Sequence, residues 1–201
     1  LGRSSADWPA FPGYDLPAWI GEGMATYYES VLTGAGRVNG TFHDMVLRTA
    51  VLEDQFEGPG QVSGLSPNWP AGIRAYAYGT SFLDYMLTEY GEERLGDFVN
   101  GVSRQLIPWR VESVAKDAFG IEFGEAWSSW QTELEATYRA RAVALAEVAP
   151  LTTGEPITTA GRFTLFPKVS PDGTRLAYFR SDGRSDLQRH VRSVNISTFE
   201  E

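Results

Sequence analysis

Residues 122–147, EFGEAWSSWQTELEATYRARAVALAE, decide the fold class. Large apolar side chains recur there at nearly helical spacing, and the segment ends before Pro150. The following stretch 155–184, EPITTAGRFTLFPKVSPDGTRLAYFRSDGR, consists of short β-rich runs separated by Pro-Asp-Gly and Asp-Gly turns. The change of pattern predicts a mainly α-helical domain over 1–149 and a short β-hairpin or blade segment over 150–201.

The same periodicity predicts the other helices of the first part. They are expected at about 17–32, 41–56, 73–90, 92–105 and 110–119. Pro17 suits the first turn of a helix, where a missing N–H costs nothing, and Gly34 and Gly36 are expected to end that helix. The stretch 57–72 holds four Gly and three Pro and is predicted to be a loop.

Composition and charge exclude several classes of protein. The 201 residues are 42% hydrophobic and 21% charged, which is typical of folded globular chains and not of disordered ones. The net charge of −9 argues against nucleic acid as the main partner. No apolar run reaches the roughly 18–20 residues of a membrane helix. The absence of Cys excludes disulfides and Cys-based zinc sites.

Both ends of the chain suggest that it belongs to a longer protein. The chain begins at Leu1 without an initiator Met or a signal-peptide pattern. It ends with STFEE directly after a strand-like stretch. We therefore expect a longer parent protein whose function depends partly on residues outside these 201.

The first candidate for chemistry is LPAWIGEGMATYYES, residues 16–30, within the first predicted helix. Glu22 follows Trp19 by three positions and therefore lies on nearly the same helix face. A carboxylate among Trp19, Met24 and Tyr27 is costly to bury unless it is paired or bound to a metal. The alternative is a solvated carboxylate near the start of the helix, favoured there by the helix dipole. The residues alone leave both interpretations open.

This segment resembles the second metal-binding helix of the gluzincin zinc metallopeptidases, particularly the aminopeptidase-like branch with its W-x-x-E-G-x-A-x-Y pattern. In that family the Glu of the Glu-Gly pair is the third protein ligand of zinc, after two His of an upstream HExxH helix. The resemblance implies that Glu22 is a metal ligand. Three protein ligands leave one zinc position for water. Thermolysin-like members carry an Asp one turn later, where this chain has Thr26.

The second candidate is YAYGTSFLDYMLTEYG, residues 76–91, an amphipathic segment with four Tyr. A Tyr stripe of this kind is typical of a core or an interface. The segment also resembles the Y-x-K-G stretch of gluzincin aminopeptidases, whose Tyr donates a hydrogen bond to the tetrahedral oxyanion. The resemblance implies that Tyr76 is a catalytic residue, whereas the family Lys is replaced by Tyr78. If both assignments hold, the side-chain oxygens of Glu22 and Tyr76 should lie about 5–10 Å apart in one cleft.

Histidine limits what this chain can do by itself. The chain has two His residues, His43 and His190, which lie far apart in sequence. It therefore contains no HExxH motif. Each is predicted to be a capping or surface residue. In the family the HExxH helix precedes the Glu-Gly helix. We therefore expect zinc in the parent protein, no cofactor bound by this chain alone, and no activity of the isolated chain.

The third candidate is FPKVSPDGTRLAYFRSDGRSDLQ, residues 166–188, which is predicted to form a β-hairpin. In its Ser-Pro-Asp-Gly turn, Pro supplies φ near −65° and Gly supplies positive φ. The pattern P-x-x-S-P-D-G-x-x-L-A-Y resembles the repeat of TolB-type β-propellers. One blade takes about 40–45 residues, so 156–201 holds about one. Its unpaired strand edges and apolar face predict either fraying or oligomerisation.

Together the resemblances imply a gluzincin-like peptidase domain followed by a TolB-type propeller. The corresponding reaction is zinc-dependent hydrolysis of a peptide or protein substrate. Proteins with such propellers are usually exported, which implies a periplasmic or extracellular bacterial location. One alternative is a non-catalytic helical scaffold or protein-binding module with a degenerate metal site. Another is a helical binding domain with an acidic groove. An upstream HExxH motif would discriminate between the enzyme and these alternatives.

Overall fold

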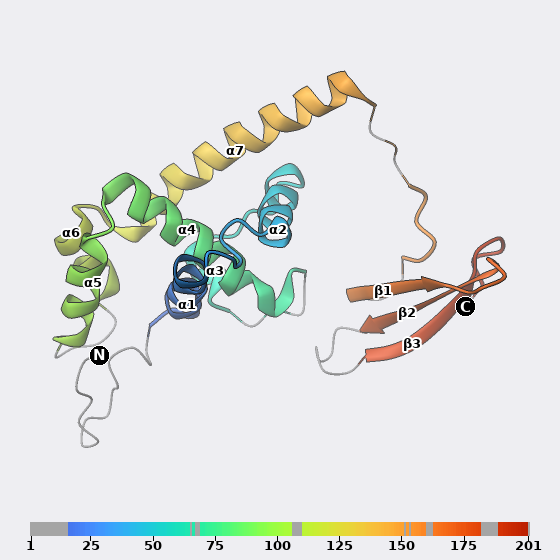
Figure 1. Ribbon diagram of the computed structural model, residues 1–201, viewed down its shortest axis with the longest axis horizontal. Coiled ribbons are helices and arrows are strands. Elements are labelled where there is room, and N and C mark those ends of the chain that lie inside the picture. Colours follow the sequence, from blue (N-terminus) through green and yellow to red (C-terminus); the bar gives the residue numbers. More distant parts are fainter. Residues whose placement is uncertain are drawn as a thin grey trace, which may run out of the picture. The chain divides into compact units, whose positions relative to one another are not determined.

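The computed structural model describes residues 16–64, 66, 69–105, 110–150, 152, 154–159, 163–181 and 189–200. It is mainly helical, with a small three-stranded antiparallel sheet at the C-terminal end of the chain, and this confirms the predicted fold class (Figure 1). The chain divides into two compact units. The helices belong to one unit, which extends to Val148, and the sheet belongs to the other.

The helical unit contains α1 (Ala18–Thr33), α2 (Thr41–Leu52), α3 (Pro59–Val62), α4 (Arg74–Tyr90), α5 (Arg94–Ser103), α6 (Val111–Phe119) and α7 (Phe123–Val148). All six predicted helices are present. Helix α2 ends earlier than predicted, because Asp54 adopts a positive φ of 53° shortly after Leu52. The predicted loop 57–72 contains the short helix α3 and the start of a 3₁₀ turn at Ala71–Ile73.

The ends of α1 follow the glycine and proline signals with one difference. Pro17 is the N-cap residue and does not lie in the first turn, and its carbonyl accepts the Ile20 N–H at 2.9 Å. Gly34 ends the helix with φ +65°, and its N–H donates to the Ser30 carbonyl at 3.0 Å. Glycine adopts this left-handed conformation without steric cost, as the sequence predicts.

Helices α1 and α4 pack against each other, and two glycines lie at their contact. A Cβ atom placed on Gly23 would lie 2.5 Å from the carbonyl carbon of Gly79. One placed on Gly79 would lie 2.1 Å from the carbonyl oxygen of Trp19. Both distances are far inside van der Waals contact, so any larger side chain would separate the helices. The glycines of the Glu-Gly and Tyr-Gly pairs therefore fix the approach of α1 to α4.

Aromatic rings fill the core between α1, α4 and α7. Trp19 meets Phe82 at a centroid distance of 5.4 Å and Trp127 at 5.3 Å, both edge to face. Phe82 and Trp127 lie 4.7 Å apart. Aromatic pairs of this kind stabilise a core by about 0.5–1.5 kcal/mol each beyond the burial of their area. This cluster holds the two glycine-paired helices against the first half of α7.

The sheet has the order β1-β2-β3, with β1 at Phe163–Val169, β2 at Arg175–Ser181 and β3 at Arg189–Asn195. Strands β1 and β2 pair in antiparallel fashion, which confirms the hairpin around the Ser-Pro-Asp-Gly turn. Gly173 has φ +73°, as that turn requires. The part of the predicted segment 166–188 after Ser181 lies outside the described residues.

Candidate functional site

The glycine contact between α1 and α4 brings the two predicted site residues together. Glu22 directly precedes Gly23 on α1, and Tyr76 lies nearly one turn before Gly79 on α4. The Tyr76 hydroxyl lies close enough to the Glu22 carboxylate for the carboxylate to affect its ionisation. Hydrogen bonding to Glu22 is the main cause that raises the pKa of Tyr76, and burial and the negative charge of Glu22 act in the same direction.

Glu22 and Tyr76 share one place on the α1–α4 surface. We expected their side-chain oxygens to lie about 5–10 Å apart in one cleft, with room for a metal and a substrate atom between them. The Glu22 carboxylate is near enough to the Tyr76 hydroxyl to raise its pKa. Both side chains are half-buried. A carboxylate partly removed from water favours a neighbouring hydroxyl donor.

Arg37 adds a cation to this pair, and the sequence analysis missed it. Its guanidinium carbon lies 5.4 Å from the centre of the Tyr76 ring, within the range of a cation–π interaction. Its Nε donates to the Glu29 carboxylate at 3.0 Å. Arg37 also acts to lower the pKa of Tyr76, opposing Glu22. Gly34 and Gly36 at the end of α1 could have indicated that Arg37 lies near the helix, because a turn at these glycines returns the chain toward it.

Tyr78, at the position of the family Lys, belongs to the core. Its ring is fully buried and stacks parallel to Trp127 at a centroid distance of 6.1 Å. Its hydroxyl accepts the backbone N–H of Glu57 at 3.3 Å. Burial raises the pKa of Tyr78 to about 12. The two tyrosines therefore have different surroundings. Tyr76 lies at the candidate site, whereas Tyr78 lies in the core, as is typical of a Tyr stripe.

A buried ion pair supports the start of α4. Only 3% of the Arg74 side chain is exposed, and its Nε atom lies 3.2 Å from the Glu57 carboxylate. Trp127 donates its indole N–H to the Glu57 backbone carbonyl at 3.2 Å. Burial raises the pKa of Glu57, and the charge of Arg74 opposes that shift. The sequence analysis missed this pair because Glu57 stands in a predicted loop.

The two histidines have different surroundings. His43 is buried, with 5% of its surface exposed, so the prediction of a capping or surface residue is wrong for it. Its position in the first turn of α2 places it on the face that carries the buried Val46 and Leu47. Burial is the first cause that lowers the pKa of His43, and the charge of Arg37 acts in the same direction. His190 on β3 is exposed, as expected.

The described residues contain no group of three or more His, Cys, Asp or Glu side chains that could hold a metal ion. Within the same residues, no helix is long and apolar enough to cross a membrane. Comparison with protein-family models, with curated proteins and with solved structures finds no significant match for this chain. The relation to gluzincin peptidases and TolB-type propellers therefore stays a hypothesis based on motifs.

Proposed function

We propose that the helical unit is the Glu-Gly half of a gluzincin-like zinc metallopeptidase domain. In this proposal Glu22 is a zinc ligand and Tyr76 is a hydrogen-bond donor to the oxyanion. The observation that supports it is the proximity of the two side chains, through which Glu22 raises the pKa of Tyr76. They lie far apart in sequence and match the family pattern separately, yet they meet, as one shared site requires. The proposed substrate is a peptide or protein in a bacterial periplasm or outside the cell.

The chemistry of Glu22 fits one ligand of a catalytic zinc. Zinc accepts carboxylate oxygen, and catalytic sites combine it with His nitrogen. Since this chain has no His pair, the two remaining ligands would have to come from an HExxH helix in a longer parent protein. Bound zinc would polarise the scissile carbonyl and lower the pKa of a water molecule. Glu22 would bind through the carboxylate that lies beside the Tyr76 hydroxyl.

Tyr76 suits the role of a neutral donor. A phenol of ordinary pKa 10.0 is protonated at neutral pH, and the raised pKa of Tyr76 favours the neutral form further. A hydroxyl beside the ligand carboxylate can turn from Glu22 toward an oxygen on which negative charge develops, at about 2.7–3.1 Å. The Arg37 guanidinium carbon lies 5.4 Å from the ring centre, where a cation–π interaction stabilises the position of the ring.

The experiment measures zinc content and hydrolysis of a fluorogenic peptide library by the full-length parent protein. Glu22→Gln should lose most bound zinc together with activity. Tyr76→Phe should keep its zinc and lose roughly 10²–10³-fold in kcat, the usual effect of removing one oxyanion donor. Glu53→Gln and Tyr28→Phe are the controls, because both side chains are exposed and lie away from the pair.

Two outcomes would contradict the proposal that the helical unit belongs to a peptidase. One is a parent sequence without an upstream HExxH motif. The other is a zinc-loaded, active parent in which Tyr76→Phe leaves kcat unchanged. The first outcome would instead favour the non-catalytic scaffold with a degenerate metal site. In that case the proximity of Glu22 and Tyr76 is a packing feature of α1 and α4.

We also propose that β1, β2 and β3 belong to one blade of a TolB-type propeller. Propeller blades are four-stranded antiparallel sheets, and the three described strands pair in sequence order. The turn pattern of the TolB-type repeat lies between β1 and β2. The test is to read the coding sequence beyond residue 201 for further Ser-Pro-Asp-Gly turns. A spacing of about 40–45 residues supports the proposal, and their absence contradicts it.

A further inference from the structure

A pocket of about 130 Å³ lies between α2, α4 and α7, apart from the Glu22–Tyr76 pair. Its polar lining consists of Arg37, His43, Asp44, Thr80, Ser81 and Tyr138. Arg37 connects the two places, because it lines this pocket and also covers the Tyr76 ring. The peptidase proposal uses none of the other five residues.

Two residues of the lining carry buried polar atoms that lack a partner. Nδ1 of His43 and Oγ1 of Thr80 have no hydrogen-bond partner among the described residues. Only 5% of His43 and 1% of Thr80 is exposed. A buried polar group without a hydrogen bond costs about 1–3 kcal/mol. Both residues line the pocket, so small side-chain rotations would bring these atoms to its wall.

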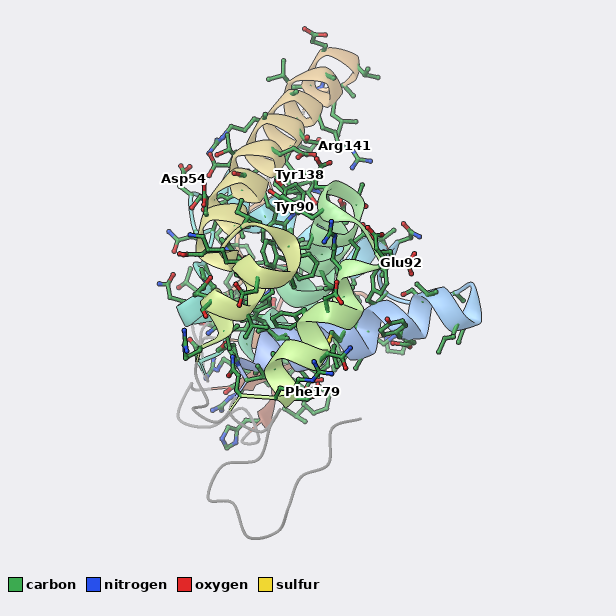
Figure 2. All side chains as sticks on the ribbon, turned by 90° about the vertical axis from the view of Figure 1, so that its left-hand side faces the viewer. Asp54, Tyr90, Glu92, Tyr138, Arg141 and Phe179 are labelled. Atoms are coloured by element: carbon green, nitrogen blue, oxygen red, sulfur yellow. The ribbon has the colours of Figure 1, made fainter. Side chains whose placement is uncertain are left out.

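The carboxylate in the lining is already neutralised. Asp44 accepts the Tyr138 hydroxyl at 3.1 Å and pairs with Arg48 at 2.9 Å. Arg141 lies 3.9 Å from the same carboxylate. Figure 2 shows Tyr138 and Arg141 on neighbouring turns of α7. Two guanidinium groups around one carboxylate leave this wall with an excess of positive charge.

The remaining polar lining is balanced in charge. Arg37 is ion-paired with Glu29 at 2.6 Å, so that pair adds no net charge. Ser81 adds a half-buried hydroxyl beside Thr80. The two hydroxyls and the imidazole can each donate a hydrogen bond, and the guanidinium groups around Asp44 make the surroundings slightly positive. Such surroundings favour a small anion over a cation.

We propose that this pocket binds a small carboxylate. Its volume of about 130 Å³ equals roughly four water molecules at about 30 Å³ each. That space fits a carboxylate group with a short tail. In this proposal the Thr80 and Ser81 hydroxyls and a proton on His43 Nδ1 donate to its oxygens, and the guanidinium groups of Arg48 and Arg141 around Asp44 supply the positive charge. The source is either a free acid or the C-terminal carboxylate of a peptide, and both present the same group.

His43 gives a direct readout, because the chain has only two His. His190→Gln, in the sheet unit, leaves His43 as the single imidazole for NMR. Acetate is titrated into the full chain, with chloride at the same ionic strength as the control. We expect a saturable shift of the His43 ring signals. We also expect the His43 pKa to rise with bound acetate, since a neighbouring anion favours the imidazolium.

Substitutions test the assigned donors. Thr80→Val keeps the shape of the side chain and should weaken acetate binding by about tenfold, as the loss of one buried hydrogen bond predicts. Ser81→Ala should also weaken it. Thr132→Val and Ser128→Ala are the matched controls, because both lie on exposed turns of α7. They should bind acetate as the unsubstituted chain does.

Two peptide probes separate the sources. N-acetylalanine carries a free carboxylate, and its methylamide lacks one. Binding of acetate together with N-acetylalanine supports a peptide terminus as the source. Binding of acetate alone supports a free acid. A non-saturable response of His43, equal binding of the methylamide, or tighter binding of phosphate than of acetate would each overturn the carboxylate site.

Discussion

Gly23 of α1 and Gly79 of α4 are in backbone contact, with the position of a Gly23 Cβ only 2.5 Å from the Gly79 carbonyl carbon. This contact determines which side chains meet on either side of it. Glu22 and Tyr76 flank it, and Glu22 raises the pKa of Tyr76. Trp19 meets Phe82 in the core beneath it. The glycines therefore couple the packing of the two helices to the geometry of the candidate site.

Gly23→Ala should destabilise the helical unit. Alanine favours a helix interior over glycine by about 1 kcal/mol, but overpacking costs about 1–3 kcal/mol, and the clash here is with backbone that cannot rotate away. We expect a net loss, measured by urea unfolding followed by circular dichroism. Gly21→Ala is the matched control in the same helix, because nothing lies within 4 Å of its Cβ position. That control should be neutral or stabilising.

Glu22→Gln should lower the pKa of Tyr76 toward its ordinary value. The carboxylate raises that pKa through a hydrogen bond and through its charge, and glutamine removes the charge. The measurement is the pH titration of ¹³C-labelled Tyr signals, with Tyr76 assigned from the Tyr76→Phe variant. Glu53→Gln, on an exposed carboxylate, should leave the titration unchanged. An unaltered Tyr76 pKa in Glu22→Gln would contradict the contact.

The order of the helices and the hairpin could be predicted because those signals are local. Apolar periodicity marks each helix, and the Pro-Asp-Gly turn marks the hairpin. The pairing of Glu22 with Tyr76 was reached through family motifs alone. How near the two side chains lie depends on how closely the backbones of α1 and α4 approach, which the two glycines allow and which composition alone does not predict.

The missed features are contacts between residues distant in sequence. Arg37 contacts Tyr76, and Glu57 contacts Arg74. No hydrophobic periodicity links either pair in the sequence. His43 was predicted at the surface because one polar residue in an early helix turn usually lies there. Its burial follows from the packing of α2 beside α4, which a single sequence does not show.

Protonation of Asp172 should destabilise the turn between β1 and β2 at low pH. Its carboxylate accepts the Ser170 and Thr174 hydroxyls and the Thr174 backbone N–H, which lowers its pKa from 3.8 to about 2. A carboxylate whose pKa is lower in the folded state stabilises the fold at pH values above its unfolded-state pKa. That stabilisation is lost as the pH falls through the folded-state pKa. Turn amides should therefore lose exchange protection between about pH 4 and 2. Asp172→Asn should remove that pH dependence.

The sheet should promote self-association through one face. Leu165, Phe179 and Val191 are cross-strand neighbours, and 40% of Phe179 and 69% of Val191 is exposed. An apolar row of this kind favours contact with a second copy. Light scattering after size exclusion should show an oligomer that Val191→Glu dissociates. Val143→Glu, on an exposed turn of α7, is the control. A strictly monomeric chain would contradict this prediction.

Breaking the buried ion pair should destabilise the helical unit in a pH-dependent way. Arg74→Met leaves the Glu57 carboxylate, of which 20% is exposed, without the guanidinium 3.2 Å away. Removing one partner of a buried pair costs about 3–5 kcal/mol, and the exposure of Glu57 points to the lower end. Urea unfolding at pH 7 measures the loss, and Arg48→Met, which breaks a half-exposed pair on α2, is the control.

The pH dependence distinguishes an unpaired carboxylate from a simple loss of packing. Burial already raises the pKa of Glu57, and removing the opposing charge of Arg74 should raise it further. A group whose folded-state pKa is raised contributes stability below its unfolded pKa and loses that contribution as pH rises through the folded one. The deficit of Arg74→Met should therefore shrink on acidification toward pH 4.5, the ordinary value for Glu. At pH 7, adding Glu57→Gln to Arg74→Met should recover part of the stability. A deficit that is constant with pH, and no recovery in the double variant, would assign the loss to packing alone.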